Sequence, residues 1–266
     1  MAGQPVSTLL ALFAASLVAG FVDSIAGGGG LITVPALALA GLDPLTVVAT
    51  NKLQSSFGSG SATLSYWRAG RIDLRSMGML PLAAAGGAIL GALSLRAIPR
   101  DAAMAALPFL LVAVAVYFAL APRAGEVDVH QRMSRPLFLA TVIPAIGFYD
   151  GVFGPGTGSF LTIGFVALMG YGLLKATAHT KLANFASNLA GLGTLALSGH
   201  VLWGTGIVMG LGQFLGARLG VAVTLRHGAR LVRPLLVAIC CLLAGKLLLD
   251  PANPAGMTLR GWISPR

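Results

Sequence analysis

Charged side chains are scarce in this chain. They make up 10% of its 266 residues, whereas soluble domains average about 25%. Hydrophobic residues account for 56%, and the mean hydropathy is +0.85. A soluble protein of this size needs a charged surface around its core, and this sequence cannot supply one. The composition therefore excludes a soluble globular protein and predicts an integral membrane protein.

Other absences narrow the class further. No Lys or Arg precedes the first apolar run, which argues against a cleaved signal peptide. The only cysteines, Cys240 and Cys241, are adjacent and lack metal-ligand spacing. No nucleotide-binding loop or catalytic Ser/His/Asp set is present, so we expect no enzyme, cofactor or metal site. The net charge is +10, but the basic residues lie in short loops between apolar runs, so nucleic acid is not an expected partner.

Ten apolar segments predict an all-α membrane fold, because barrel strands would alternate instead. They cover about 7–26, 31–41, 46–66, 77–95, 102–121, 136–153, 159–171, 176–197, 204–224 and 234–249. The second and the seventh are too short to span a bilayer at about 1.5 Å per residue, and each follows a glycine-rich break. A polar loop at 122–135 separates a first transmembrane repeat, 1–121, from a second, 136–249, and a polar tail follows at 250–266.

The two halves resemble each other in sequence. GFVDSIAGGGG at 20–30 matches GFYDGVFGPGTG at 147–158. The offset then settles at 129, as for Lys52 and Lys181, and it holds across three segments. A constant offset of this kind indicates an internal duplication. We therefore expect two repeats of about five helical segments each, with a glycine-broken or re-entrant helix in each repeat.

The distribution of Lys and Arg predicts the orientation. Basic residues cluster at 68–75, 122–135 and 226–233, which the positive-inside rule places in the cytoplasm. The loops then alternate between the two sides of the membrane, provided that the two segments around each glycine break together start and end on the same side. Each half then makes an odd number of crossings, so the repeats are expected to be inverted and both termini extracytoplasmic. Arg96 and Arg100 are the exception, because this scheme leaves them outside.

The glycine breaks are the first candidate site. Inverted repeats with broken helices are a recurrent architecture of secondary transporters, whose binding sites lie at the breaks. The helix that follows each break would direct its free N–H groups and its positive dipole end at a pocket, which suits an anion. The candidate residues are Gly27, Gly28, Gly29, Gly30, Gly154, Gly156, Thr157 and Gly158. The alternative is that the glycines only allow close helix packing.

Two lysines with nearby amides are the second candidate site. ATNKLQSSFGS at 49–59 matches AHTKLANFASN at 178–188, and each places a lysine in an otherwise apolar helix. Intramembrane ionisable residues are candidates for function. The candidate residues are Asn51, Lys52, Gln54, Ser55, Thr180, Lys181, Asn184 and Asn188. The alternative is that both lysines extend to an interface from near the helix starts.

Asp23 and Asp150 are the only carboxylates well inside apolar segments. Three interpretations remain open: they carry protons that couple transport, they pair with the lysines, or they cap the broken helices through backbone N–H groups. Pairing would neutralise the lysines and weaken their role as an anion site.

Taken together, these motifs resemble the sulfite exporter TauE/SafE family of bacterial membrane transporters. The resemblance covers residues 7–249. The resemblance rests on the motifs GFVDSIAGGGGLITVPAL (20–37), ATNKLQSS (49–56), GGAILGA (86–92), GFYDGVFGPGTGSF (147–160), TKLANFASN (180–188) and GQFLGARLG (212–220). The resemblance implies an inner-membrane permease for small organosulfur or sulfur oxyanions, such as sulfite or sulfonates.

We therefore expect a multi-pass secondary transporter, acting as an exporter, of small sulfur oxyanions across the bacterial inner membrane. An inside-negative potential favours anion export by about 2.3 kcal/mol per charge per 100 mV, so export needs no ATP. The alternatives are a passive anion channel, an importer of sulfonate- or thiosulfate-type anions, and a non-transporting membrane subunit. The expected partners are the oxyanion and the lipid bilayer, with a homodimer as one assembly.

Overall fold

The computed structural model describes residues 4–94 and 127–249, together with a few positions between 109 and 119. These residues form helices joined by loops, and no strand occurs among them, which confirms the all-α fold class. The segment predicted at 102–121 lies mostly outside the described residues. Arg96, Arg100 and the tail at 250–266 lie entirely outside them.

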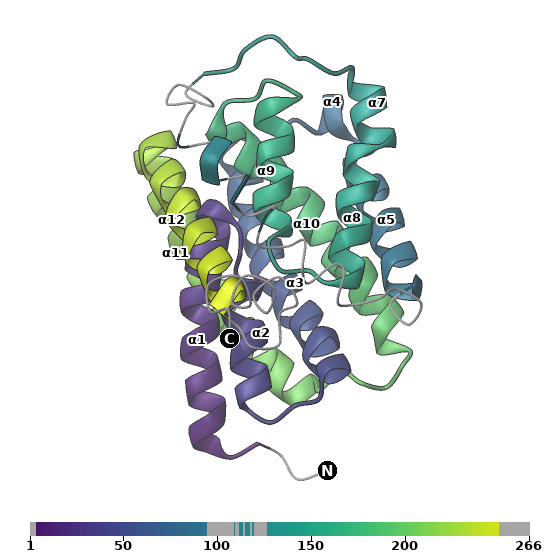
Figure 1. Cartoon of the computed structure of the whole chain (residues 1–266), viewed down its shortest axis with the longest axis vertical. Coiled ribbons are helices and arrows are strands. Elements are labelled where there is room, and N and C mark those ends of the chain that lie inside the picture. The colour runs from purple at the N-terminus through teal and green to yellow at the C-terminus, as the bar shows by residue number, and fades with distance from the viewer. Residues whose placement is uncertain are drawn as a thin grey trace, which may run out of the picture.

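The helices follow the apolar segments of the sequence closely (Figure 1). The first half contains α1 (Val6–Ala26), α2 (Gly30–Leu39), α3 (Pro44–Arg68), α4 (Leu74–Met77) and α5 (Leu80–Ser94). The second half contains α7 (Arg135–Ala140), α8 (Val142–Val152), α9 (Thr157–Ala167), α10 (Leu173–Ala196), α11 (Trp203–His227) and α12 (Ala229–Leu249). The helices after the two breaks, α2 and α9, have 10 and 11 residues and are too short to cross a bilayer, as predicted.

The predicted segment 136–153 contains two helices, because α7 and α8 are separated at Thr141. The hydroxyl of Thr141 donates to the carbonyl of Leu137 at 2.7 Å. Pro144 has no N–H with which to continue the helical ladder to the carbonyl of Ala140. A Thr and a Pro three residues apart therefore interrupt the helix where the hydrophobic pattern continues.

The surface of several helices is apolar. α1 and α11 are long and apolar enough to cross a membrane, with mean hydropathies of 2.1 and 1.5. Large apolar side chains are exposed on α1, α5 and α11: Leu10, Val18, Leu82, Leu90, Leu211 and Leu219. Apolar side chains exposed on several helices are expected where a protein faces lipid. In contrast, α3 and α10 bury many polar side chains at the centre of the molecule.

Glycines hold the outer helices close to one another. A Cβ on Gly216 of α11 would overlap the backbone carbonyl of Leu17 on α1. A Cβ on Gly87 of α5 would likewise overlap the carbonyl of Pro144 on α8. Such close backbone approach is typical of membrane helix pairs. It fixes α1 on α11 and α8 on α5, and so it fixes the ends of α1 and α8 where the breaks begin.

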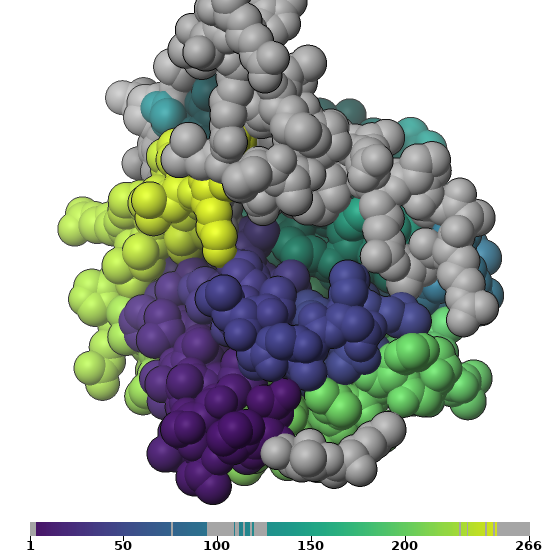
Figure 2. All heavy atoms as spheres, turned by 60° about the horizontal axis from the view of Figure 1, so that its bottom comes forward, coloured from purple at the N-terminus to yellow at the C-terminus, as the bar shows by residue number. Residues whose placement is uncertain are grey.

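The loops divide between two ends of the molecule. Residues 70–73, 127–128 and Gly228 line one hollow together with the start of α10, so the three basic stretches of the sequence meet at one end, called here the basic end. At the opposite end, Gln4 donates to the carbonyl of Ala40, and the amide of Leu202 donates to the Thr50 hydroxyl. Figure 2 turns this opposite end forward and shows α1, α2 and the start of α3 beside the segment between α10 and α11.

Candidate functional site

Both helix breaks depend on glycine. In the first, α1 ends at Ala26, and the next two residues, Gly27 and Gly28, have positive φ, 82° and 90°. In the second, Gly154 and Gly156 have φ of 84° and 86° between α8 and α9. L-residues with side chains avoid this left-handed region, so these four positions favour glycine for the backbone alone.

The two breaks also pack against each other. A Cβ on Gly27 would lie 2.7 Å from the carbonyl carbon of Gly158, and a Cβ on Gly158 would lie 2.8 Å from the Cα of Gly27. The hydroxyl of Ser159 donates to the carbonyl of Ala26 at 3.2 Å. Gly30 differs, because a Cβ added there would lie 3.6 Å from the Cα of Pro155, which is an ordinary van der Waals contact. The packing interpretation therefore holds for Gly27 and Gly158 but not for Gly30.

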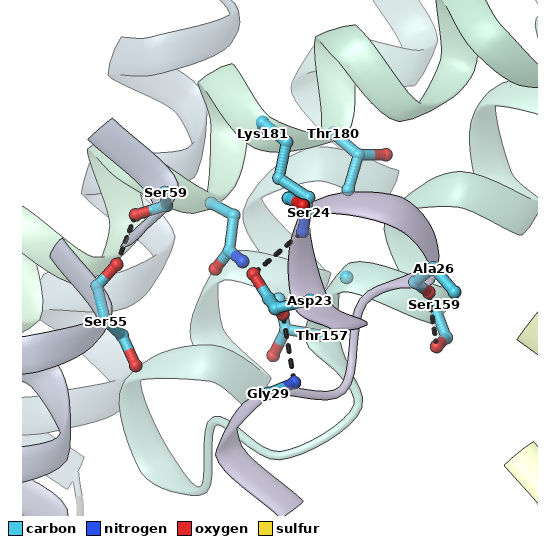
Figure 3. A network of polar contacts seen from close by, with 12 residues as sticks. Asp23, Ser24, Ala26, Gly29, Ser55, Ser59, Thr157, Ser159, Thr180 and Lys181 are labelled. Carbon is cyan, nitrogen blue, oxygen red and sulfur yellow. Dashed lines mark hydrogen bonds and ion pairs between the residues drawn. The ribbon is translucent and has the colours of Figure 1, made fainter. Parts of the chain in front are cut away.

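The first carboxylate, Asp23, both caps a helix and pairs with a lysine. Its Oδ1 accepts from the backbone N–H of Gly29 at 3.0 Å, at the start of α2. Its Oδ2 accepts from the ammonium of Lys181 on α10 at 2.9 Å. Figure 3 shows both contacts, with Thr157 of the second break close by. Two of the three interpretations left open for Asp23, capping and pairing, are thus realised together.

The second carboxylate, Asp150, pairs with the other lysine. Lys52 Nζ on α3 lies 2.8 Å from Asp150 Oδ2, although the ammonium forms no well-aligned hydrogen bond with a described residue. Asp150 also accepts from two hydroxyls, Thr157 Oγ1 at 2.9 Å and Ser187 Oγ at 2.7 Å. Each pair therefore joins a helix break of one half of the chain to a long helix of the other half.

The two lysines do not reach an interface. Lys52 is 1% exposed and Lys181 is fully buried, so the alternative that they extend to the membrane surface is wrong. Removing two ammonium groups from water costs several kcal/mol each, and only a close counter-charge offsets that cost. The carboxylates at 2.8 and 2.9 Å provide that counter-charge.

Polar side chains of α2, α3, α9 and α10 extend the network around the ion pairs. Thr33 donates to Asn51 Oδ1 at 2.6 Å, and Gln54 Nε2 donates to the same oxygen at 2.7 Å. In the second half, Asn188 Nδ2 donates to Asn184 Oδ1 at 2.9 Å. These bonds fix the amides in place, which a site for a small polar ligand requires.

Most of the predicted site residues meet around one small cavity of about 20 Å³. Its lining consists of Asp23, Gly28, Gly30, Asn51, Ser55, Asp150, Gly154, Gly156, Thr157, Gly158, Asn184 and Asn188. The other predicted residues are outside this lining: Gly27, Gly29, Lys52, Gln54, Thr180 and Lys181. Both lysines contact the lining through their aspartates. A single water needs roughly 10–15 Å³. The structure is therefore closed around a space that holds about one water.

Sequence reasoning missed three hydroxyls of this network. Thr33 bonds Asn51, and Ser187 bonds Asp150. Thr162 lies 3.2 Å from the hydroxyl of Thr180. The repeat offset of 129 places Thr33 and Thr162 at matching positions. This match in the sequence could have identified both threonines. Among the described residues, no group of three His, Cys, Asp or Glu side chains could hold a metal ion.

The fold and the site together define a class: a helical membrane protein in which two broken helices meet at a buried charged cavity, as in membrane transporters. The chain belongs to the sulfite exporter TauE/SafE family, whose family model matches residues 12–247.

Relatives support the same class. The chain is 54% identical over 252 residues to "Probable membrane transporter protein ORF9" of Sinorhizobium sp, with 95% of each chain covered. It is 44% identical over 239 residues to "Probable membrane transporter protein YfcA" of Escherichia coli (strain K12), covering 90% of this chain and 89% of that one. A Bacillus subtilis (strain 168) relative, "Probable membrane transporter protein YunE", is 24% identical over 254 residues, covering 85% of this chain and 93% of that one. No solved structure matches the chain significantly.

Proposed function

We propose that the protein is a secondary transporter that carries a small sulfur oxyanion, such as sulfite or a short organosulfonate, through the cavity between the two breaks. The supporting observation is that the N-termini of α2 and α9 and two buried Lys–Asp pairs converge on one cavity. The first-turn N–H groups of a helix lack intrahelical partners and lie at its positive dipole end. Gly30 and Gly158, which belong to those first turns, line the cavity.

The inverted arrangement of the two halves is part of the proposal. The contact of Gly216 with Leu17 recurs in the chain as the contact of Gly87 with Pro144, at the offsets of the sequence repeat. The two ion pairs are related in the same way, because Asp23 corresponds to Asp150 and Lys181 to Lys52. Inverted repeats of this kind allow one site to open alternately to each side of the membrane.

The proposed direction is export from the cytoplasm across the inner membrane. The basic end carries the stretches at 68–75, 127–135 and 226–233, and the positive-inside rule assigns that end to the cytoplasm. Both termini are then extracytoplasmic. An inside-negative potential moves an anion outward without ATP.

Uptake of labelled sulfite into inside-out vesicles tests the proposal. We expect saturable uptake that unlabelled sulfite on the opposite side stimulates. Replacement of Lys181 by Ala should abolish this uptake, whereas the matched control Lys175→Ala, on the same helix but in an exposed pair with Asp128, should preserve it. No uptake of sulfite, thiosulfate or short sulfonates above empty vesicles would contradict the proposal. Flux that rises linearly with concentration and shows no trans-stimulation would indicate a channel instead.

A further inference from the structure

The two ion pairs lie on opposite sides of the cavity. Lys181 is two residues from His179, whose Nε2 accepts from the backbone N–H of Asp73 at the basic end. Lys52 is two residues from Thr50, whose hydroxyl accepts from the N–H of Leu202 at the opposite end. Each helical residue advances the chain by about 1.5 Å. The Lys181–Asp23 pair is therefore on the basic-end side of the cavity, and the Lys52–Asp150 pair is on the other side.

Each pair also joins one half of the chain to the other. Lys181 is on α10 of the second half and Asp23 is at the end of α1 of the first half. Lys52 is on α3 of the first half and Asp150 is near the end of α8 of the second half. The cavity of about 20 Å³ is too small for an oxyanion, so groups that close it must move before an oxyanion can enter.

We propose that the two ion pairs are the two gates of the transporter. Lys181–Asp23 closes the cavity toward the basic end, and Lys52–Asp150 closes it toward the opposite end. The substrate oxyanion opens each gate by taking the place of the carboxylate beside the lysine. This assignment rests on the proposed transport function and adds which residues control each side.

The surroundings of the two carboxylates suit this exchange. When the oxyanion replaces Asp23 beside Lys181, the carboxylate keeps the N–H of Gly29 and is hydrated from the basic-end side that has opened. When it replaces Asp150 beside Lys52, that carboxylate keeps the hydroxyls of Thr157 and Ser187. The lysine has an anionic partner before and after the exchange, so no ammonium is left buried and unpaired, which would cost several kcal/mol. The lysines therefore need the substrate in order to release their aspartates.

Thiol accessibility from each side of the membrane tests the gates without requiring a known substrate. In a background with Cys240→Ala and Cys241→Ala, Ser55→Cys places a reporter thiol in the cavity lining. A charged, membrane-impermeant methanethiosulfonate is added to one side of sealed vesicles. Arg71→Cys at the basic end and Leu197→Cys at the opposite end, both exposed, calibrate which side the reagent reaches.

Opposite sidedness is the expected result. Asp23→Asn with Lys181→Gln removes one pair without leaving a lone charge, and it should raise the labelling rate from the basic end at least about tenfold, since about 1.4 kcal/mol of lost closure is a tenfold change. Asp150→Asn with Lys52→Gln should do the same from the opposite end only. The single variants Asp23→Asn and Asp150→Asn should give the same sidedness if a double variant does not fold.

Three results would overturn the assignment: equal increases from both sides, sidedness opposite to that stated, or no increase for either pair. The transport assay is independent of this readout. One-sided labelling without flux of sulfite, thiosulfate or sulfonates would support the gate assignment and contradict the proposed substrate. Flux of these anions without one-sided labelling would contradict the gate assignment alone.

Discussion

The two ion pairs have the same charges and similar lengths, but their surroundings differ. Asp23 is held by one backbone N–H and by a directed hydrogen bond from Lys181. Asp150 is held by two hydroxyls, and Lys52 approaches it without a well-aligned hydrogen bond. One site thus depends mainly on its lysine, whereas the other distributes its support over several groups. The two matching motifs carry the same charge pair with different hydrogen bonds around it.

The largest effect should come from removing a lysine. Lys181→Met leaves Asp23 buried with only the Gly29 amide, and we expect it to destabilise the protein by about 3–5 kcal/mol. Lys52→Met should cost less, because Thr157 and Ser187 still bond Asp150. Thermal unfolding in detergent micelles measures both. A greater loss for Lys52→Met would show that the hydroxyls do not compensate and would break the comparison.

A change where the breaks touch should damage both sites together. Gly27→Ala forces a left-handed residue and places a methyl group 2.7 Å from Gly158, so we expect a loss of about 2–4 kcal/mol. Gly30→Ala is the control, because its methyl group meets nothing closer than 3.6 Å and its stability should stay within about 0.5 kcal/mol. Thiol labelling of the cavity should rise from both sides in Gly27→Ala. An increase from one side only would mean that the breaks act separately.

A smaller effect should distinguish the Asp150 site alone. Ser187→Ala removes a 2.7 Å hydrogen bond to a carboxylate, and we expect a loss of about 1.5–3 kcal/mol. Ser59→Ala is the control, because its hydroxyl only returns to the carbonyl of Ser55 on its own helix. The unfolding temperatures of the two variants provide the measurement. Equal losses would show that the bond from Ser187 adds nothing specific to the pair.

The smallest effect should come from the exposed pair between Asp128 and Lys175. Partial burial raises the pKa of Asp128, but hydrogen bonds from Lys175 and from the N–H of Gly172 outweigh it, so the pKa is lowered. Because the pKa of Asp128 is lower in the folded protein than the unfolded value of about 3.9, its ionised form adds stability at pH values above that unfolded value. The added stability is lost as the pH falls through the folded pKa. Asp128→Asn should cost only about 0.2–1 kcal/mol at neutral pH, because the pair is exposed.

Salt should separate this exposed pair from the buried ones. At about 1 M salt the screening length is about 3 Å, so the coupling between Asp128 and Lys175 should fall by about half. The coupling between Asp23 and Lys181 should remain, because solvent ions do not reach a buried pair. Double-mutant cycles at low and high salt measure both couplings. A buried coupling that fell as much as the exposed one would show that the cavity is open to solvent.

The helix breaks and the charged residues near them could be predicted from the sequence, but which aspartate pairs with which lysine could not. Composition, hydrophobic runs and glycine clusters depend on local sequence, and they predicted the all-α fold and the short helices α2 and α9. The repeat aligned Asp23 with Asp150 and Lys52 with Lys181, yet it could not show that each aspartate pairs with the lysine of the other half. That pairing depends on how α1, α3, α8 and α10 pack, over separations of more than 90 residues.

The crossed pairs also determine how the empty protein responds to voltage. Two buried ammonium groups and two buried carboxylates sum to zero charge. Electrical work on a moving site is proportional to the net charge that it carries across the field, at about 2.3 kcal/mol per charge per 100 mV. Under the proposed cycle, the unloaded site therefore reorients without electrical work, and the membrane potential acts only on the step that carries the bound anion.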